Sequence, residues 1–357
     1  MKKLVLSDIH EDIGGKMINF SGFYMPVQYT GIKDEHHAVR NNVGVFDVSH
    51  MGQIFISGDN SSKLIQYITS NDVGLLYPGK VQYTCFPNNY GGIIDDLLLY
   101  MLSDNHYLLV VNASNIEKDL DWINKHNNMG CKVDNQSGDY SLLAVQGPKS
   151  IEVLQNITDI NLNDIKYYHF NIGTISNIND VIISRTGYTG EIGFELYVKN
   201  NYVKILWDSI FSISTDIKPI GLAARDTLRL EKGFCLYGND IDDSTSPIEA
   251  GLGWITKFNN NFINSYELEK QKGGNIKRKL VALELIDKGI ARKGYNILDI
   301  NRNVVGCITS GTMSPTLNKA IAMGYISSKC LISHKEVFIE IRKKLIKAKI
   351  TTLPFVK

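Results

Sequence analysis

Two adjacent carboxylates stand inside an apolar stretch of the sequence. The stretch 93–101 follows a glycine pair and has the composition of a strand, so Asp95 and Asp96 point to opposite faces. A carboxylate among apolar residues costs free energy unless it is paired or hydrogen-bonded. In one interpretation both acids are structural, one closing the preceding turn. In the other, one of them faces a cavity, where it could stabilise a cationic intermediate or move a proton.

A second candidate is the glycine-rich loop within 185–195. Gly187, Gly190 and Gly193 are spaced by three, but the G-x-G-x-x-G pattern is absent and the loop leads from strand to strand. A dinucleotide site is therefore not expected, because that site needs a helix N-terminus after the glycines. Two interpretations remain: the glycines allow an excursion that presents Tyr188 as a flat aromatic wall, or the segment is a plain hairpin loop.

A helix predicted over 221–231 places two arginines one turn apart. Arg225 and Arg229 repel each other at this i, i+4 spacing unless each has an acidic partner, which Asp226, Glu231 or distant acids could supply. We favour a structural ion-pair helix. The alternative is that one guanidinium holds a carboxylate, amide or ring edge through a forked contact.

Metal chemistry has little support in the cysteines and histidines. The five cysteines are scattered without a C-x-x-C pair, which argues against a disulfide framework and a zinc site. His36 and His37 point about 100° apart on a helix predicted over 33–40, so they converge poorly on one metal. We expect that helix to have a solvated polar face. His50 ends an apolar strand, and we expect a hydrogen-bonded structural histidine.

Composition excludes several classes of protein. The 357 residues include 38 Lys and Arg against 37 Asp and Glu, whereas a nucleic-acid binder normally shows a basic excess or stripe. Hydrophobic residues are 43% and charged residues 21% of the chain, which excludes intrinsic disorder. The N-terminus lacks the apolar segment of a signal peptide, and no run approaches the roughly 18 apolar residues of a membrane span. We therefore expect a cytoplasmic protein with neither nucleic acid nor membrane as partner.

Short strands alternate with a few helices before residue 270. Strands are predicted over 53–57, 80–86, 93–101, 107–112, 141–146, 181–185 and 194–198. Further helices are predicted over 61–68, 115–125 and 201–213. The hairpin-like neighbours 80–86 and 93–101 favour antiparallel pairing, so the fold class is α+β and not a doubly wound parallel sheet.

The C-terminal part has a different pattern. A domain boundary is predicted in the polar stretch 269–275. Beyond it, strands are predicted over 280–285, 304–310, 322–326, 336–341 and 348–352. Their regular spacing indicates a small β-barrel or sandwich. The polar turn 310–317 is interpreted as structural.

These motifs, in this order, resemble the glycine cleavage system T-protein (aminomethyltransferase) family over essentially the whole chain. The segments that carry the resemblance are Gly15-Lys16-Met17, Met25-Pro26-Val27-Gln28-Tyr29, 45–52, 91–100, 111–115, 146–148, 185–195, 221–231, Leu236-Tyr237-Gly238-Asn239-Asp240, 310–317 and Leu353-Pro354-Phe355-Val356.

The resemblance implies a fold and a reaction. The fold is a multidomain cloverleaf of mostly antiparallel sheets around a central hole that holds tetrahydrofolate. Its domains are 1–52 with 141–268 (folate-binding), 53–140 (an α+β domain carrying Asp96) and 276–357 (the C-terminal β-barrel). The partner is the H-protein, whose lipoyl group delivers an aminomethyl group on sulfur. Ammonia leaves, and the methylene carbon passes to tetrahydrofolate to give 5,10-methylenetetrahydrofolate.

The resemblance also assigns the site. Asp96 is the catalytic acid, and strand alternation then turns Asp95 elsewhere. A fixed carboxylate in a dry pocket can stabilise developing positive charge and hold the exchanged proton. The flat slot for the pterin is assigned to Met51, Tyr83, Asn112 and Tyr188, with Glu195 and Arg225 fixing its polar edges. Arg229 is left as structural, and no metal is expected.

Three other functions share this fold. They are a tetrahydrofolate-dependent demethylase of a small N- or S-methyl compound, an iron–sulfur maintenance protein, and a non-catalytic folate-binding protein. The iron–sulfur family carries a Lys-Gly-Cys-Tyr-x-Gly-Gln signature, whereas 232–239 reads Lys-Gly-Phe-Cys-Leu-Tyr-Gly-Asn, with the cysteine displaced and the glutamine absent. The intact Asp96 disfavours a non-catalytic module, so the demethylase is the main alternative.

Overall fold

The computed structural model describes residues 1–274, 276–331 and 336–357. Asn275, the last residue of the predicted boundary, lies outside the described residues. The chain divides into two compact units. The first unit comprises Met1–Leu64, Val73–Tyr83 and Leu97–Asp226, and the second unit comprises Ile65–Asp72, Thr84–Asp96 and Thr227–Lys357.

A six-stranded sheet organises the first unit. Its strand order is β11 (Phe170–Ile175), β12 (Ile178–Ser184), β13 (Gly193–Lys199), β10 (Tyr140–Gln146), β4 (Gly44–Asp47) and β14 (Lys218–Pro219). The pairs are antiparallel except β4 with β14. Apolar residues of this sheet pack with helices α5 (Ser150–Gln155) and α6 (Val203–Ile213) into one core. A small sheet in the order β1 (Lys2–Lys3), β3 (Phe23–Gln28), β2 (Lys16–Phe20) and helix α1 (Ser7–Asp12) precede it.

A five-stranded sheet carries the adjacent carboxylates. Its order is β6 (Val81–Pro87), β7 (Ile93–Ser103), β8 (His106–Val111), β5 (Gly52–Ser57) and β9 (Lys132–Asn135). The predicted neighbours 80–86 and 93–101 are therefore adjacent strands, β6 and β7. Helices α3 (Ser61–Ile68) and α4 (Ile116–His126) fall where helices were predicted over 61–68 and 115–125.

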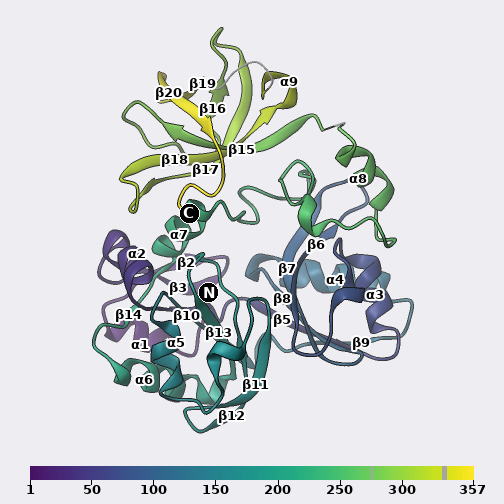
Figure 1. Ribbon diagram of the computed structural model, residues 1–357, viewed down its shortest axis with the longest axis vertical. Helices are drawn as coiled ribbons and strands as arrows, with labels where there is room; N and C mark the ends of the chain where they lie inside the picture. Colours follow the sequence, from purple (N-terminus) through teal and green to yellow (C-terminus); the bar gives the residue numbers. More distant parts are fainter. Residues whose placement is uncertain (275, 332–335) are drawn as a thin grey trace. The chain divides into compact units, whose positions relative to one another are not determined.

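The C-terminal strands form a closed barrel (Figure 1). The order is β15 (Arg278–Leu285), β18 (Lys319–Ser327), β17 (Val304–Ser314), β16 (Asn296–Leu298), β19 (Glu336–Ile341) and β20 (Lys344–Thr351), with β20 pairing back to β15. The C-terminal part, which was predicted to be a barrel or a sandwich, is therefore a barrel. Strand β16 was not predicted, because three residues are too short to show alternation, yet it joins β17 to β19. The expected α+β class with a C-terminal barrel is confirmed.

The helix predicted over 33–40 forms as α2 (Ile32–Asn41), but its polar face is not fully solvated. Glu35 and His36 are both buried. The Glu35 carboxylate accepts hydrogen bonds from the backbone N–H groups of Tyr29 and Gly31 through Oε1 and of Gly221 through Oε2. The expectation of a solvated face was wrong for Glu35 because its carboxylate satisfies backbone donors just before α2 and just before helix α7 (Leu222–Lys232), and it was wrong for His36, which is buried as well.

No helix in residues 1–274, 276–331 and 336–357 is long and apolar enough to cross a membrane. The remaining α-helices are α8 (Ser265–Lys272) and α9 (Ser328–Leu331).

The turn before β7 leaves no room for a side chain at Gly92. A Cβ there would lie 1.7 Å from the carbonyl oxygen of Asp243. Asn88 holds both segments of this contact, since its Nδ2 donates to the Asp243 carbonyl and its Oδ1 accepts from the Gly92 N–H. We expect Gly92→Ala to lower the free energy of unfolding by about 1–3 kcal/mol, because backbone must move to admit the methyl group. Urea unfolding measures this change.

Gly138→Ala is the matched control, because a Cβ at Gly138 meets nothing within 4 Å. If the two variants lose the same stability, the close approach at Gly92 is not the cause.

Candidate active site

Glu195 lies at the centre of the polar groups in the first unit. It stands on β13 opposite Ser184 of β12, and its side chain is buried. Burial raises the pKa of Glu195, while the hydrogen bond from Thr186 and the charge of Arg225 lower it. The Thr186 hydroxyl donates to Glu195 Oε2 at 2.5 Å, which is the short distance typical of a hydroxyl on a carboxylate.

Thr186 and three further buried hydroxyl groups behind it are named here the hydroxyl cluster, which comprises Tyr100, Ser184, Thr186 and Tyr197. The Tyr100 hydroxyl lies 3.1 Å from Ser184 Oγ and 2.8 Å from the Tyr197 hydroxyl, and Ser184 Oγ lies 2.9 Å from Thr186 Oγ1. Sequence reasoning missed this cluster. One available signal was that Glu195 and Tyr197 share a face of β13. Tyr100 could not be linked to them in this way, because it lies 84 positions before Ser184 in the chain.

Arg225 and Tyr188 lie against each other in the same unit. The Arg225 guanidinium lies over the Tyr188 ring, 4.7 Å from its centroid, which is a cation–π contact. Helix α7 brings Arg225 there, and Gly221 before it approaches the Val27 backbone so closely that no side chain fits. The glycine-rich loop joins the adjacent antiparallel strands β12 and β13, as a hairpin loop does, and the role of Tyr188 as an aromatic wall stays a prediction.

Polar contacts hold the part of the loop that follows Tyr188. Arg40 donates to the Thr189 carbonyl at 2.7 Å and to Glu191 Oε1 at 2.8 Å. The Thr189 hydroxyl donates to Gln146 Oε1 at 2.8 Å. These contacts fix the segment that follows Tyr188.

His50 is not the hydrogen-bonded histidine that the sequence led us to expect. Its ring is buried, its Nδ1 has no hydrogen-bond partner, and its edge packs against Phe20 and Phe23. Burial, together with the nearby charge of Arg225, lowers the pKa of His50 to about 3. The imidazole is therefore neutral, and it precedes Met51, which is half-buried between β4 and β5.

The two adjacent carboxylates differ in exposure, as alternation requires. Asp95 is fully buried and Asp96 is half-buried, both on the part of β7 that belongs to the second unit. Tyr83 on β6 and Asn112 after β8 are half-buried residues of the first unit. The structure thus groups Tyr188, Glu195 and Arg225 within one unit, whereas the roles of Asp96, Met51, Tyr83 and Asn112 stay predictions.

Two buried thiols lie within the electrostatic reach of Asp96. Burial raises the pKa of Cys85 to about 12, with the charges of Asp96 and Asp95 adding to the effect. Burial and the charges of Asp240 and Asp96 raise the pKa of Cys235 in the same way. Burial therefore favours the protonated thiol at both positions.

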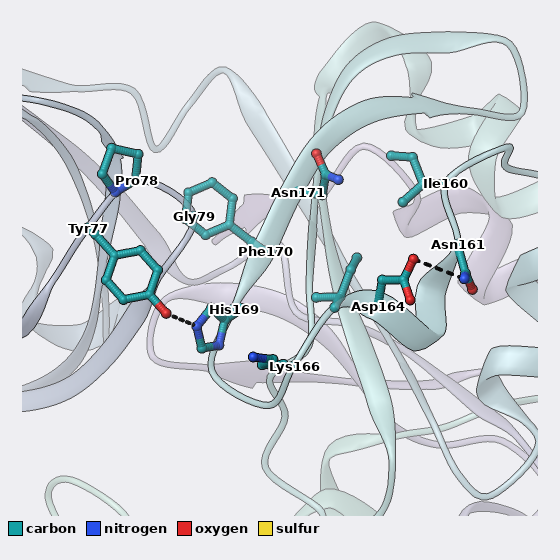
Figure 2. A pocket seen from close by; sticks show the side chains of 11 residues that line it. Tyr77, Pro78, Gly79, Ile160, Asn161, Asp164, Lys166, His169, Phe170 and Asn171 are labelled. Carbon is teal, nitrogen blue, oxygen red and sulfur yellow. Dashed lines mark hydrogen bonds between the residues drawn. The ribbon is translucent and has the colours of Figure 1, made fainter.

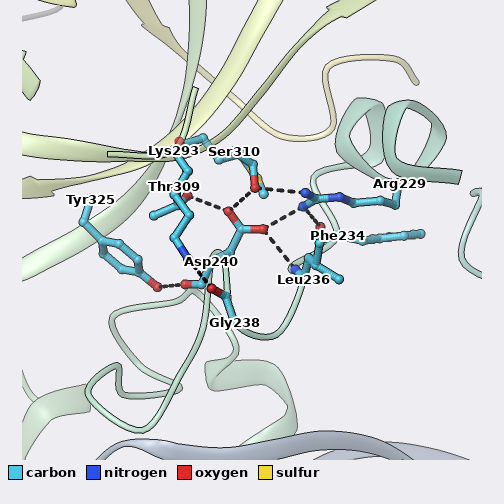
Figure 3. Close-up of polar contacts among 10 residues, drawn as sticks. Arg229, Phe234, Leu236, Gly238, Asp240, Lys293, Thr309, Ser310 and Tyr325 are labelled. Carbon is cyan, nitrogen blue, oxygen red and sulfur yellow. Dashed lines mark hydrogen bonds and ion pairs between the residues drawn. The ribbon is translucent and has the colours of Figure 1, made fainter. Parts of the chain in front are cut away.

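Arg229 belongs to a buried ion pair in the second unit (Figure 3). Its Nη1 lies 2.6 Å from Asp240 Oδ2, and its Nη2 donates to Ser310 Oγ at 2.9 Å. Asp240 Oδ1 accepts from the hydroxyls of Thr309 and Ser310. A distant acid therefore neutralises Arg229, which is the structural role expected for it.

The segment 310–317, predicted as a polar turn, continues strand β17 as far as Ser314 and turns only from Pro315, but its structural role is as expected. Besides Ser310, its Ser314 and Thr316 hydroxyls both donate to the Glu231 carboxylate. Helix α7 is thereby fastened to the barrel strand β17 within the second unit.

A surface cavity of about 450 Å³ opens elsewhere in the first unit (Figure 2). Tyr77 and His169 lie side by side in its lining, with the Tyr77 hydroxyl 2.7 Å from His169 Nε2. None of the residues predicted for the active site line this cavity. No group of three or more His, Cys, Asp or Glu that could hold a metal ion occurs in the described parts of the chain.

The fold and the polar groups define a class of α+β proteins with a closed six-stranded barrel at the C-terminus. Residues 6–260 match the model of the GCVT N-terminal domain, and residues 278–357 match that of the glycine cleavage T-protein C-terminal barrel domain. The chain therefore belongs to the glycine cleavage T-protein family.

Relatives match over their whole length. The chain is 54% identical to a Flavobacterium psychrophilum protein and 52% identical to a Bacteroides fragilis protein, both named aminomethyltransferase, with 100% of each chain covered. Its structure is similar to the crystal structure of glycine cleavage system aminomethyltransferase T from Bartonella henselae. The TM-score is 0.93 at 33% identity, over 99% of this chain and 98% of the other.

Proposed function

We propose that this protein is the aminomethyltransferase of the glycine cleavage system. It takes the aminomethyl group carried by the lipoyl arm of the H-protein, releases ammonia and passes the methylene carbon to tetrahydrofolate, giving 5,10-methylenetetrahydrofolate. The observation that carries this proposal is the 54% identity, over the full length of both chains, to a protein named aminomethyltransferase. The proposed partner is a lipoylated H-protein, and the proposed compartment is the cytoplasm.

The first unit offers groups that suit a reduced folate. Tetrahydrofolate supplies two nucleophilic ring-side nitrogens to the reaction, and its pterin ring presents N–H donors on one edge. A carboxylate only accepts hydrogen bonds, so Glu195 complements that edge, and the Tyr188 ring offers a flat surface capped by Arg225. We assign Met51, Tyr83 and Asn112 to the remainder of the slot on the strength of the family resemblance.

Asp96 is the proposed catalytic residue. The transfer requires that positive charge on nitrogen be stabilised and that a proton reach the departing amine. A half-buried carboxylate fixed on β7 suits both tasks, because its charge is only partly screened by water. Asp95, buried on the opposite face, is left with a structural role.

The test is a complete reaction with the full-length protein. Given aminomethylated H-protein and tetrahydrofolate, it is expected to release ammonia and form methylenetetrahydrofolate in equal amounts. A rate no higher than that of the protein-free control would refute the proposal. Loss of methyl groups from small N- or S-methyl compounds, without ammonia release from the H-protein, would instead indicate the demethylase.

A further inference from the structure

The hydroxyl cluster converges on Thr186, because the Ser184 and Tyr100 hydroxyls both lie within hydrogen-bond distance of Thr186 Oγ1, at 2.9 and 3.3 Å. Thr186 donates its single hydroxyl proton to the Glu195 carboxylate, so it can only accept in its contact with Ser184. Ser184 therefore donates to Thr186, and it accepts from Tyr100. Tyr100 in turn accepts from Tyr197. With Glu195 ionised, the four hydroxyl protons can thus all be directed towards one carboxylate, which Thr186 alone among them contacts.

This direction fits an ionised Glu195. A carboxylate accepts at Oε2, and every proton of the chain then has an acceptor. A proton on Oε2 would instead make Thr186 the acceptor, and Thr186 would then have to turn its own hydroxyl proton back onto Ser184 or Tyr100. Hydrogen bonds in series also polarise one another, so the last donor, Thr186, is strengthened by those behind it.

We infer that the hydroxyl cluster is a positioning device that keeps Glu195 ionised and oriented, and so sets the pH range over which this site holds its ligand. Tyr100, Ser184, Thr186 and Tyr197 act through Glu195 and need not touch the ligand. The inference rests on the proposed function for the identity of that ligand, a reduced folate.

Several other groups surround Glu195. The cation is Arg225 from helix α7, and it also favours the ionised carboxylate. The tyrosines that feel the charge of Glu195 are Tyr100, Tyr167, Tyr168 and Tyr197. Burial raises the pKa of all four, so they stay neutral near pH 7 and do not compete with Glu195 for the role of anion.

The sign of the pH effect follows from these contacts. Donors to a carboxylate lower its pKa, so removing the Thr186 hydroxyl raises the pKa of Glu195 further. Affinity that needs the ionised carboxylate is full above that pKa and is lost as the pH falls through it. In Thr186→Val the loss should therefore begin about one pH unit higher than in the wild type.

The first experiment measures tetrahydrofolate affinity against pH, without oxygen, for the wild type, Thr186→Val and Thr186→Ser. Below the shifted midpoint, Thr186→Val is expected to bind about tenfold more weakly, and above it the affinities should agree within a few fold. Thr186→Ser keeps the donor and should restore the wild-type profile. Thr174→Val, at an exposed position on β11, is the matched control. Titration of the ligand itself affects all variants equally, so it cancels in the comparison.

A loss of affinity that is equal at every pH would overturn the inference, because it would indicate structural damage and not a change in the charge of Glu195. If Thr186→Val does not fold, Tyr100→Phe serves instead. It removes a hydroxyl that acts on Glu195 through Thr186 and Ser184, so its shift should be smaller and in the same direction.

The second experiment needs no ligand. Carbon-13 NMR of protein labelled at glutamate carboxyls follows Glu195 directly, with Glu195→Gln identifying its signal. An upward shift of the midpoint in Thr186→Val supports the inference even if tetrahydrofolate does not bind, in which case the proposed function alone fails. An unchanged midpoint in the folded variant overturns the inference whatever binds.

Discussion

Replacing Asp96 by asparagine is expected to reduce turnover about a hundredfold to ten-thousandfold, which is the range for a positioned acid or base. Asparagine keeps the size of the side chain but can neither hold the proton nor stabilise positive charge. Because Asp96 is proposed to act on the reacting atoms and not to bind the pterin, the affinity for tetrahydrofolate should stay within a few fold. Single-turnover release of ammonia and equilibrium binding of folate measure the two quantities separately.

Asp104→Asn is a suitable control, since Asp104 is exposed in the turn that follows the same strand. It should turn over at the wild-type rate. Unchanged turnover in Asp96→Asn would remove Asp96 from the catalytic role. A parallel loss of folate affinity would mean that Asp96 serves mainly in binding.

Replacing Asp240 by asparagine is expected to cost about 3–5 kcal/mol of unfolding free energy, the usual penalty for breaking a buried ion pair on one side. Arg229 is only 1% exposed, so its charge would remain in the interior without a counter-ion. Asparagine also cannot accept at both ends, as Asp240 does from Arg229 and Thr309. Urea unfolding of the full chain measures the loss.

The barrel offers a matched control in the exposed ion pair between Lys347 and Glu336. Glu336→Gln should cost less than about 1 kcal/mol, because solvent already screens that pair. The double variant Arg229→Met with Asp240→Leu should recover much of the loss, since no charge is then left buried. Equal losses in Asp240→Asn and Glu336→Gln would show that burial does not set the value of the Arg229 pair.

Much of the fold could be predicted because it depends on neighbours in the sequence. Strand alternation separated Asp95 from Asp96, and the difference in their exposure follows that separation. Helix 61–68 was predicted at its observed bounds, because an amphipathic run with a capping signal is a local property. Elements too short to show a period, such as β16, gave no comparable signal.

Other features could not be predicted because their partners lie far apart in the chain. Arg229 finds Asp240 and Ser310, of which the second is 81 positions away. His50 looked like an ordinary hydrogen-bonded histidine, since nothing nearby shows that Phe20 and Phe23 enclose its ring. Long-range packing decides such environments, and one sequence does not specify which distant side chains meet.

The sequence by itself determined the α+β class, most strands and helices, the barrel-like C-terminus, and through its ordered motifs the family. These properties follow from local periodicity and from runs of neighbouring residues, so they can be predicted without knowing which distant residues are in contact. Only the tertiary structure decided which polar groups share an environment: Glu195 with Thr186 and Arg225, and Arg229 with Asp240. The physical reason is that burial sets the strength and charge state of such groups, and burial exists only once the chain has folded.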